Sequence, residues 1–226
     1  MIMEKKSSAA VVFPVYSVKE EILNSMLHGF GVLAAIAGLV LLSLKAGGTI
    51  GGHRADSLEI VAAVIFTATM IGMFLASTLY HGIQNIKAKN ILRKIDHSVI
   101  FIFIAGTYTP FCLVGLEGGG WGWSIFGIQW FLAITGITLN VINYTAFRKV
   151  SMVVYIMMGW VIAVGFVPLF RLVEIQSIIP LVIGGILYTA GTFWYRKKDV
   201  KHSHAVWHSF VLLGALCHWY AIWRMF

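Results

Sequence analysis

Seven apolar stretches constrain this chain more than any other feature of its sequence. Crossing the hydrocarbon core of a bilayer takes about 20 mostly apolar residues in a helix. Seven stretches come close to that length, and the chain has a mean hydropathy of +0.85. They cover residues 22–44, 58–83, 95–114, 122–142, 150–170, 175–195 and 204–223. The sequence therefore predicts an all-α integral membrane protein, a bundle of seven transmembrane helices.

The Lys and Arg residues predict how the bundle is oriented, because cytoplasmic loops are enriched in them. Of the 17 in the chain, 13 fall before the first stretch or in every second loop after it, and four fall on the other side. We expect residues 1–21 to be a short cytoplasmic segment, residues 22–226 a single transmembrane domain, and the C-terminus to be external. The net charge of +8 does not indicate nucleic-acid binding, because the basic residues lie between apolar runs.

Two histidines stand one helical turn apart at the start of the last stretch. His204 and His208 are at positions i and i+4, so on a helix their imidazoles project from one face. This is a spacing with which two ring nitrogens can bind one zinc ion. The alternative is that both are interfacial histidines that meet lipid headgroups.

A third histidine is predicted to lie at the same depth in the membrane. At 1.5 Å per residue, His81 is about 9 Å from cytoplasmic Lys87, and His204 and His208 are about 5 and 10 Å from Lys201. Three histidines plus a water make a catalytic zinc arrangement. The set predicts a metal site just beneath the cytoplasmic surface, with zinc, iron or manganese as candidate ions.

Two further polar residues enter this layer. Asp96 could orient or deprotonate the water, or it could instead be a helix N-cap next to Lys94. Ser77 is one turn before His81, so its hydroxyl could bond the water, a ligand or a developing oxyanion. Alternatively, Ser77 bonds back to a carbonyl of its own helix.

The remaining polar residues are expected to support the structure. Glu21, Asn24 and His28 form a stripe on one face of the first helix, which favours bracing of the site over ligation. His218 is about 21 Å beyond His204 and is expected to be a satisfied interior histidine. His97 is expected to point toward another helix. The two loop histidines, His53 and His202, are expected to be solvated.

Together these residues carry a resemblance to a known family. Ser77-Thr78-Leu79-Tyr80-His81, Asp96 and His204-Ala205-Val206-Trp207-His208 resemble the S-x-x-x-H, Asp and H-x-x-x-H motifs of the progestin and adipoQ receptor family. The segment from Glu20 to His28 is similar to the bacterial branch of that family, the hemolysin III proteins. The resemblance covers all seven stretches. It implies that His81, His204 and His208 are zinc ligands, with Asp96 and Ser77 beside the water.

The resemblance also suggests what the protein does. The wider superfamily includes alkaline ceramidases, which implies a zinc-dependent hydrolase of lipid amides or esters, or a lipid-homeostasis protein derived from one. The implied location is the plasma membrane of a bacterium, with a membrane lipid as substrate or ligand. Two alternatives stay open: a non-catalytic signalling or homeostasis protein with a structural zinc, and a cytolytic pore-forming protein. Hormone-receptor function is not implied, because the chain has almost no N-terminal cytoplasmic domain.

Overall fold

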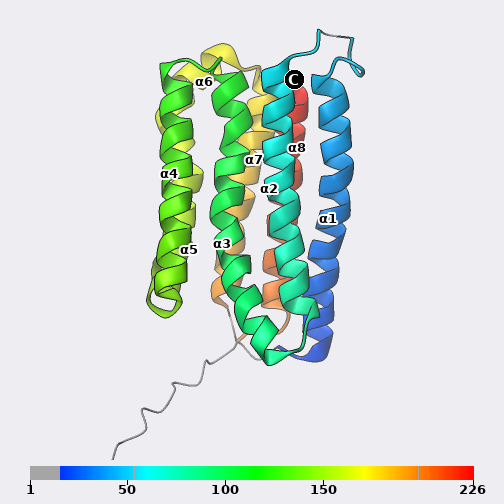
Figure 1. Cartoon of the computed structure of the whole chain (residues 1–226), viewed down its shortest axis with the longest axis vertical. Coiled ribbons are helices and arrows are strands. Elements are labelled where there is room, and N and C mark those ends of the chain that lie inside the picture. The colour runs from blue at the N-terminus through cyan, green and yellow to red at the C-terminus, as the bar shows by residue number, and fades with distance from the viewer. Residues whose placement is uncertain (1–15, 53, 198) are drawn as a thin grey trace, which may run out of the picture.

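The fold is an all-α bundle, seen here in a computed structural model that describes residues 16–52, 54–197 and 199–226. Within these residues, seven helical segments are long and apolar enough to cross a membrane. The chain runs up and down the bundle, so α1 begins at the end opposite the C-terminus (Figure 1). The predicted fold class and the odd number of spans are therefore confirmed.

Five of the seven spans are single helices. The bounds of these helices are α1 Val18–Ala46, α2 Ser57–Gly82, α4 Gly120–Ile142 and α7 Ile175–Arg196. The last span, α8, is also one helix, Ser203–Met225. Short polar residues begin several helices, since their side chains accept hydrogen bonds from free backbone N–H groups. Ser17 and Glu20 form such a reciprocal cap at the start of α1.

The third span begins nine residues earlier than the apolar pattern predicts. Helix α3 covers Ile86–Pro110, and a π-helical turn, η1, continues it through Phe111–Gly115. Asn85 caps its start by accepting a hydrogen bond from the N–H of Ala88. The early residues are basic helix formers, so they extend the helix beyond its apolar part.

The fifth span changes helical type partway across. It consists of α5 Tyr144–Trp160, a 3₁₀ stretch η2 Val161–Gly165, and α6 Phe166–Leu172. Pro168 has no N–H for a bond to the preceding turn, which accounts for the irregular backbone before it. The Tyr108 hydroxyl satisfies part of this break, because it donates to the Gly159 carbonyl and accepts from the Ile162 N–H.

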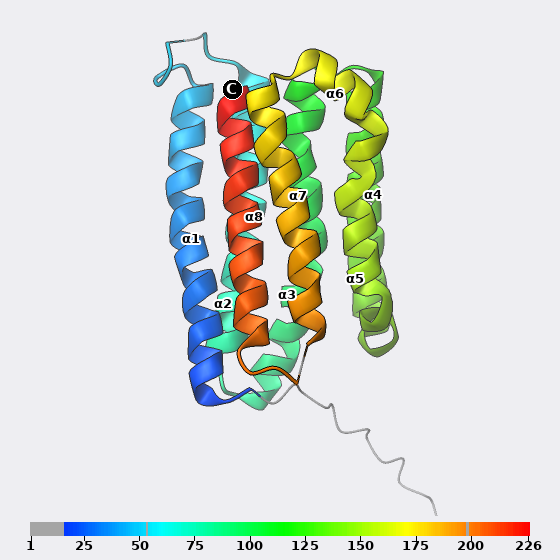
Figure 2. The same cartoon turned by 180° about the vertical axis from the view of Figure 1, so that it is seen from behind.

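Helix α1 lies at one edge of the bundle, where it packs against both α2 and α8. Figures 1 and 2, seen from opposite sides, show α1 beside these two helices and α4 with α5 at the far edge. Most residues of the main core belong to α1, α2, α3, α7 and α8, and η1, α4, η2 and α6 each add one or two. The site residues below come from the elements that surround this core.

The outer surface is apolar where it would meet lipid. Leu33, Phe131 and Val167 are 66%, 68% and 65% exposed. Such residues, spread over the sides of the bundle, would be unfavourable in water but suit a hydrocarbon environment. The chain is a multi-pass membrane protein.

Candidate metal centre

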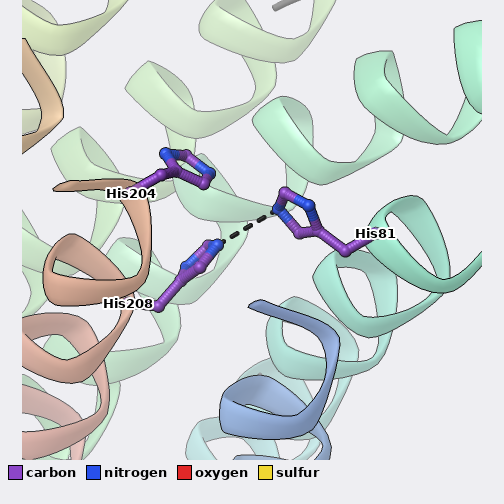
Figure 3. Close-up of side chains that lie close together, drawn as sticks. All are labelled: His81, His204 and His208. Atoms are coloured by element: carbon purple, nitrogen blue, oxygen red, sulfur yellow. Dashed lines mark hydrogen bonds between the residues drawn. The ribbon is translucent and has the colours of Figure 1, made fainter. Parts of the chain in front are cut away.

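Three histidines from two helices meet near the end of the bundle where α1 begins. His81 comes from the last turn of α2, and His204 and His208 come from the first two turns of α8 (Figure 3). One ring nitrogen from each lies within 4.8 Å of the others. His81 and His208 are buried, and His204 is partly buried. The predicted meeting of residues more than a hundred positions apart is therefore confirmed.

The spacing of the ring nitrogens fits a shared cation. The Nε2 atoms of His81 and His208 are 3.1 Å apart. Two nitrogens bound to one tetrahedral zinc, each at about 2.0–2.1 Å, are about 3.3 Å apart. The ring centroids of His204 and His208 are 4.4 Å apart, which places the third imidazole beside the other two. Three neutral imidazoles are a donor set that zinc accepts readily, and the geometry therefore fits a metal ion.

Glu21 fixes which nitrogen of His81 faces the cluster. Its Oε2 lies 2.6 Å from His81 Nδ1, so this nitrogen carries the proton and donates to the carboxylate. His81 Nε2 is then left with a lone pair directed at the other histidines. Lys89, on α3, donates to the second carboxylate oxygen of Glu21 at 2.7 Å. The bracing role expected for Glu21 matches these contacts.

Asp96 lies inside α3 rather than at its start. It is ten residues beyond Ile86, and Asn85 is the capping residue, so the N-cap alternative is wrong. The Asp96 carboxyl group lies near His81, and the Ser77 hydroxyl lies close enough to donate a hydrogen bond to it. The carboxyl group is therefore positioned beside the histidine cluster, on the side formed by α2 and α3.

The Ser77 hydroxyl is buried, makes no hydrogen bond to its own helix, and faces the Asp96 carboxyl group. The next residue, Thr78, does bond back to its own helix, through the carbonyl of Phe74 at 2.8 Å. The back-bonding alternative for Ser77 is therefore wrong in this structure. The Ser77 hydroxyl is therefore left to interact with Asp96 and with a ligand beside it, because its own helix does not satisfy it.

The polar stripe on α1 continues deeper than Glu21. Asn24 and His28 are buried, and the structure describes no hydrogen-bond partner for the amide of Asn24 or for either ring nitrogen of His28. The His28 ring is 3.8 Å from the ring of His208, between centroids. His28 thus packs against the cluster, but the group whose nitrogens converge consists of the other three histidines.

The other histidines lie away from the cluster. His97 Nδ1 is 3.3 Å from the Tyr144 hydroxyl on α5, and His218 Nε2 is 3.1 Å from the Leu181 carbonyl on α7. His97 matches its prediction, whereas His218 is satisfied as predicted at Nε2 only, because its buried Nδ1 has no partner among the described residues. The His202 side chain, expected to be solvated, is 43% exposed, but its Nδ1 is buried 3.9 Å from Glu20 Oε1; His53 lies outside the described residues.

Sequence reasoning missed two residues of the site. The Tyr16 ring stacks on the His204 ring, with centroids 5.0 Å apart and an interplanar angle of 22°. Burial, with smaller effects from Tyr195 and Glu21, raises the pKa of Tyr16 above its ordinary value, so the phenol stays neutral. Lys89 was counted only as a charge that sets orientation. No local pattern identifies either residue, because each contact joins different parts of the chain.

Comparison with known proteins places the chain in a family. The model of the family described as "Haemolysin-III related" matches residues 16–219. A hemolysin-3 homolog from Bacillus subtilis is 39% identical over 208 residues, which cover 92% of this chain and 95% of the relative. Hemolysin-3 from Bacillus cereus is 36% identical over 205 residues, 91% of each chain. Human monocyte to macrophage differentiation factor is 27% identical over 218 residues, 91% of this chain and 84% of the relative. Because the family model and these relatives match nearly the whole chain, the chain belongs to the haemolysin-III related family.

Proposed function

We propose that this protein is a zinc-dependent hydrolase of lipid amides or esters. The observation that carries the proposal is the meeting of three imidazoles next to the Asp96 carboxyl group and the buried Ser77 hydroxyl beside it. A metal that only held helices together would not require these two extra groups. Their positions support a reaction at the cluster.

Each residue has a distinct role in the proposed site. His81, His204 and His208 would hold the zinc, with Glu21 keeping His81 in the required tautomer. Bound zinc supplies Lewis acidity and lowers the pKa of a coordinated water to about 7. The histidines contribute no net charge of their own, so the ion keeps its positive charge for polarising a carbonyl.

Asp96 and Ser77 would handle the proton and the developing charge. Asp96 would accept the proton that the attacking water loses, and would later return it to the leaving nitrogen or oxygen. The Ser77 hydroxyl would donate a hydrogen bond to the carbonyl oxygen as that oxygen gains negative charge. The two groups are neighbours near His81, which is what concerted use on one substrate needs.

The position of the cluster suggests a lipid substrate at the cytoplasmic side of a bacterial plasma membrane. The site lies among the ends of spanning helices, so a lipid could place its carbonyl there while its tail stays in hydrocarbon. Among the described residues, ten Lys and Arg residues belong to segments at this end of the bundle and four to the other end, which favours a cytoplasmic location. Two of the relatives are bacterial.

Metal content tests the ligand assignment. We expect the protein purified in detergent to carry about one zinc per chain by mass spectrometry, and His208→Ala to lose it. His218→Ala is the matched control, because His218 is a buried histidine ten residues further along α8. Wild-type protein without zinc after purification and zinc loading, or zinc retained in full by His208→Ala, would refute the assignment.

A structural zinc without turnover is the second candidate. The cluster joins His81 on α2 to two residues of α8, so an ion there would connect two spans directly. Asp96→Asn separates the two functions. For a hydrolase, loss of the base should slow turnover by about 10²–10⁴-fold with zinc retained, so substrate lipids accumulate in cells that carry the variant. For a structural zinc, the cellular lipid profile should match that of wild type.

A further inference from the structure

Two neighbouring glutamates in the first turn of α1 each hold a different segment that carries a zinc-ligand candidate. Glu21 accepts a hydrogen bond from His81 at the end of α2. Glu20 accepts one, at 3.1 Å, from the backbone N–H of His202, at the start of α8. Adjacent residues of a helix point about 100° apart, and α1 packs against both α2 and α8. One turn of α1 therefore contacts His81 and the residue two positions before His204.

The Glu21 contact is buried and held from two sides. The His81 side chain is fully buried, and the side chains of Glu21 and Lys89 are 7% and 12% exposed. Lys89 also donates to the Tyr80 carbonyl at 3.1 Å, which fixes its ammonium group at the end of α2. Glu21 is thus oriented by a cation that is itself anchored beside His81. A carboxylate held in this way restricts both the tautomer and the rotation of the imidazole.

The Glu20 contact fixes the backbone immediately before His204. His202 has a positive φ of 61°, which is uncommon for a residue with a side chain, and it directly precedes α8. Glu20 Oε1 accepts from the N–H of this residue, while Glu20 Oε2 accepts from the N–H and hydroxyl of Ser17. The Glu20 carboxylate therefore connects the start of α1 to the turn that sets the direction in which α8 begins.

We propose that Glu20 and Glu21 are positioning residues that set the metal affinity of the centre. They would form a clasp, defined here as these two carboxylates with their bonds to His202 and His81. The inference rests on the zinc-binding part of the proposed function. It adds that the site is preorganised only while the first turn of α1 is docked between α2 and α8.

Zinc affinity, measured by competition with a chelator in detergent, tests the clasp. Removing an outer partner of a metal-binding histidine typically costs about 10- to 100-fold in affinity. We expect a loss of that size for Glu21→Ala, and a smaller loss for Glu20→Ala, which acts through the backbone. Glu21→Gln and Glu20→Gln keep an acceptor oxygen, so each should recover most of the affinity that its alanine variant loses. Glu174→Ala is the control, because Glu174 is an exposed residue just before α7, at the opposite end of the bundle.

The outcomes separate the clasp from a purely structural role. The melting temperature of zinc-free protein is measured in parallel, since a residue that matters only for packing would change it without changing zinc affinity. Alanine variants that bind zinc as wild type does would refute the clasp while leaving the metal site in place. Glutamine variants as weak as the alanine variants would also refute it. If Glu21→Ala does not fold, Glu20→Ala at its less buried position carries the test. Wild-type protein that binds no zinc would refute both proposals.

Discussion

Gly31 is a position where one added methyl group should change stability by a measurable amount. A Cβ built on Gly31 would lie 2.7 Å from Cγ and Cδ1 of Phe74 on α2. Ordinary carbon contacts are about 3.5–4.0 Å, so the overlap is about 1 Å. Phe74 is fully buried, and Cγ is the ring atom nearest its backbone. The ring cannot turn away from the methyl group, so α1 and α2 have to separate locally.

Gly29 supplies the matched control on the same helix. A Cβ there would lie 3.8 Å from the Thr78 methyl group, which is an ordinary contact. Both Gly31→Ala and Gly29→Ala gain the same helix propensity, about 1 kcal/mol, so this gain cancels in the comparison. The difference between the two variants is then the cost of overpacking, about 1–3 kcal/mol. For a chain of this size, that corresponds to melting temperatures about 2–12 °C apart.

A thiol-reactive dye can follow this unfolding in variants that also carry Cys217→Ser, because the second free thiol, Cys217, is only partly buried. Cys112 is completely buried in the native bundle, so its thiol becomes reactive only as the bundle opens. We expect Gly31→Ala to expose it at a lower temperature than Gly29→Ala does, in the same detergent. Equal melting temperatures for the two variants would mean that α1 and α2 are not in close contact at Gly31. The reasoning from this contact would then be wrong.

Two further predictions concern the metal and the broken fifth span. Removing zinc with a chelator should lower the melting temperature of wild type but not that of His208→Ala. The reason is that zinc at 100 times its dissociation constant stabilises the folded protein by about 2.7 kcal/mol. Tyr108→Phe removes the hydroxyl that bonds Gly159 and Ile162 at 2.7 and 2.8 Å. This variant should lower the free energy of unfolding by about 1–3 kcal/mol. The control is Tyr220→Phe, at a half-exposed ring, which should leave that free energy unchanged. Equal melting temperatures for the two variants would contradict this prediction.

Hydropathy predicted the number of spans correctly but did not predict where each helix ends. It measures which residues suit hydrocarbon, and a helix can continue beyond that region wherever its side chains favour helix. The extension of α3 to Ile86 shows the difference, because its basic residues lower hydropathy without ending the helix. The extension matters for the site, since it carries Lys89 to the carboxylate of Glu21.

The three-histidine cluster could be predicted because depth along a helix follows from residue number. A rise of 1.5 Å per residue places His81 and His208 in one layer whatever the rotation of their helices. Rotation is what the sequence leaves undetermined. The contact of Glu21 with His81 and the stacking of Tyr16 on His204 depend on how neighbouring helices face each other. That arrangement is set by packing along the whole length of each helix.

The packing at Gly31 and the clasp at Glu21 are connected through the spacing of α1 and α2. The Glu21 carboxylate can lie 2.6 Å from His81 Nδ1 only if α1 and α2 lie close together. A glycine ten residues further along α1, about 15 Å away, allows that approach by leaving room for Phe74. The Phe74 ring also packs edge-on against His28, with centroids 5.0 Å apart, and His28 packs on His208. The geometry of the candidate centre therefore depends on how closely α1 and α2 pack. Gly31→Ala should accordingly weaken zinc binding as well as lower the stability of the bundle.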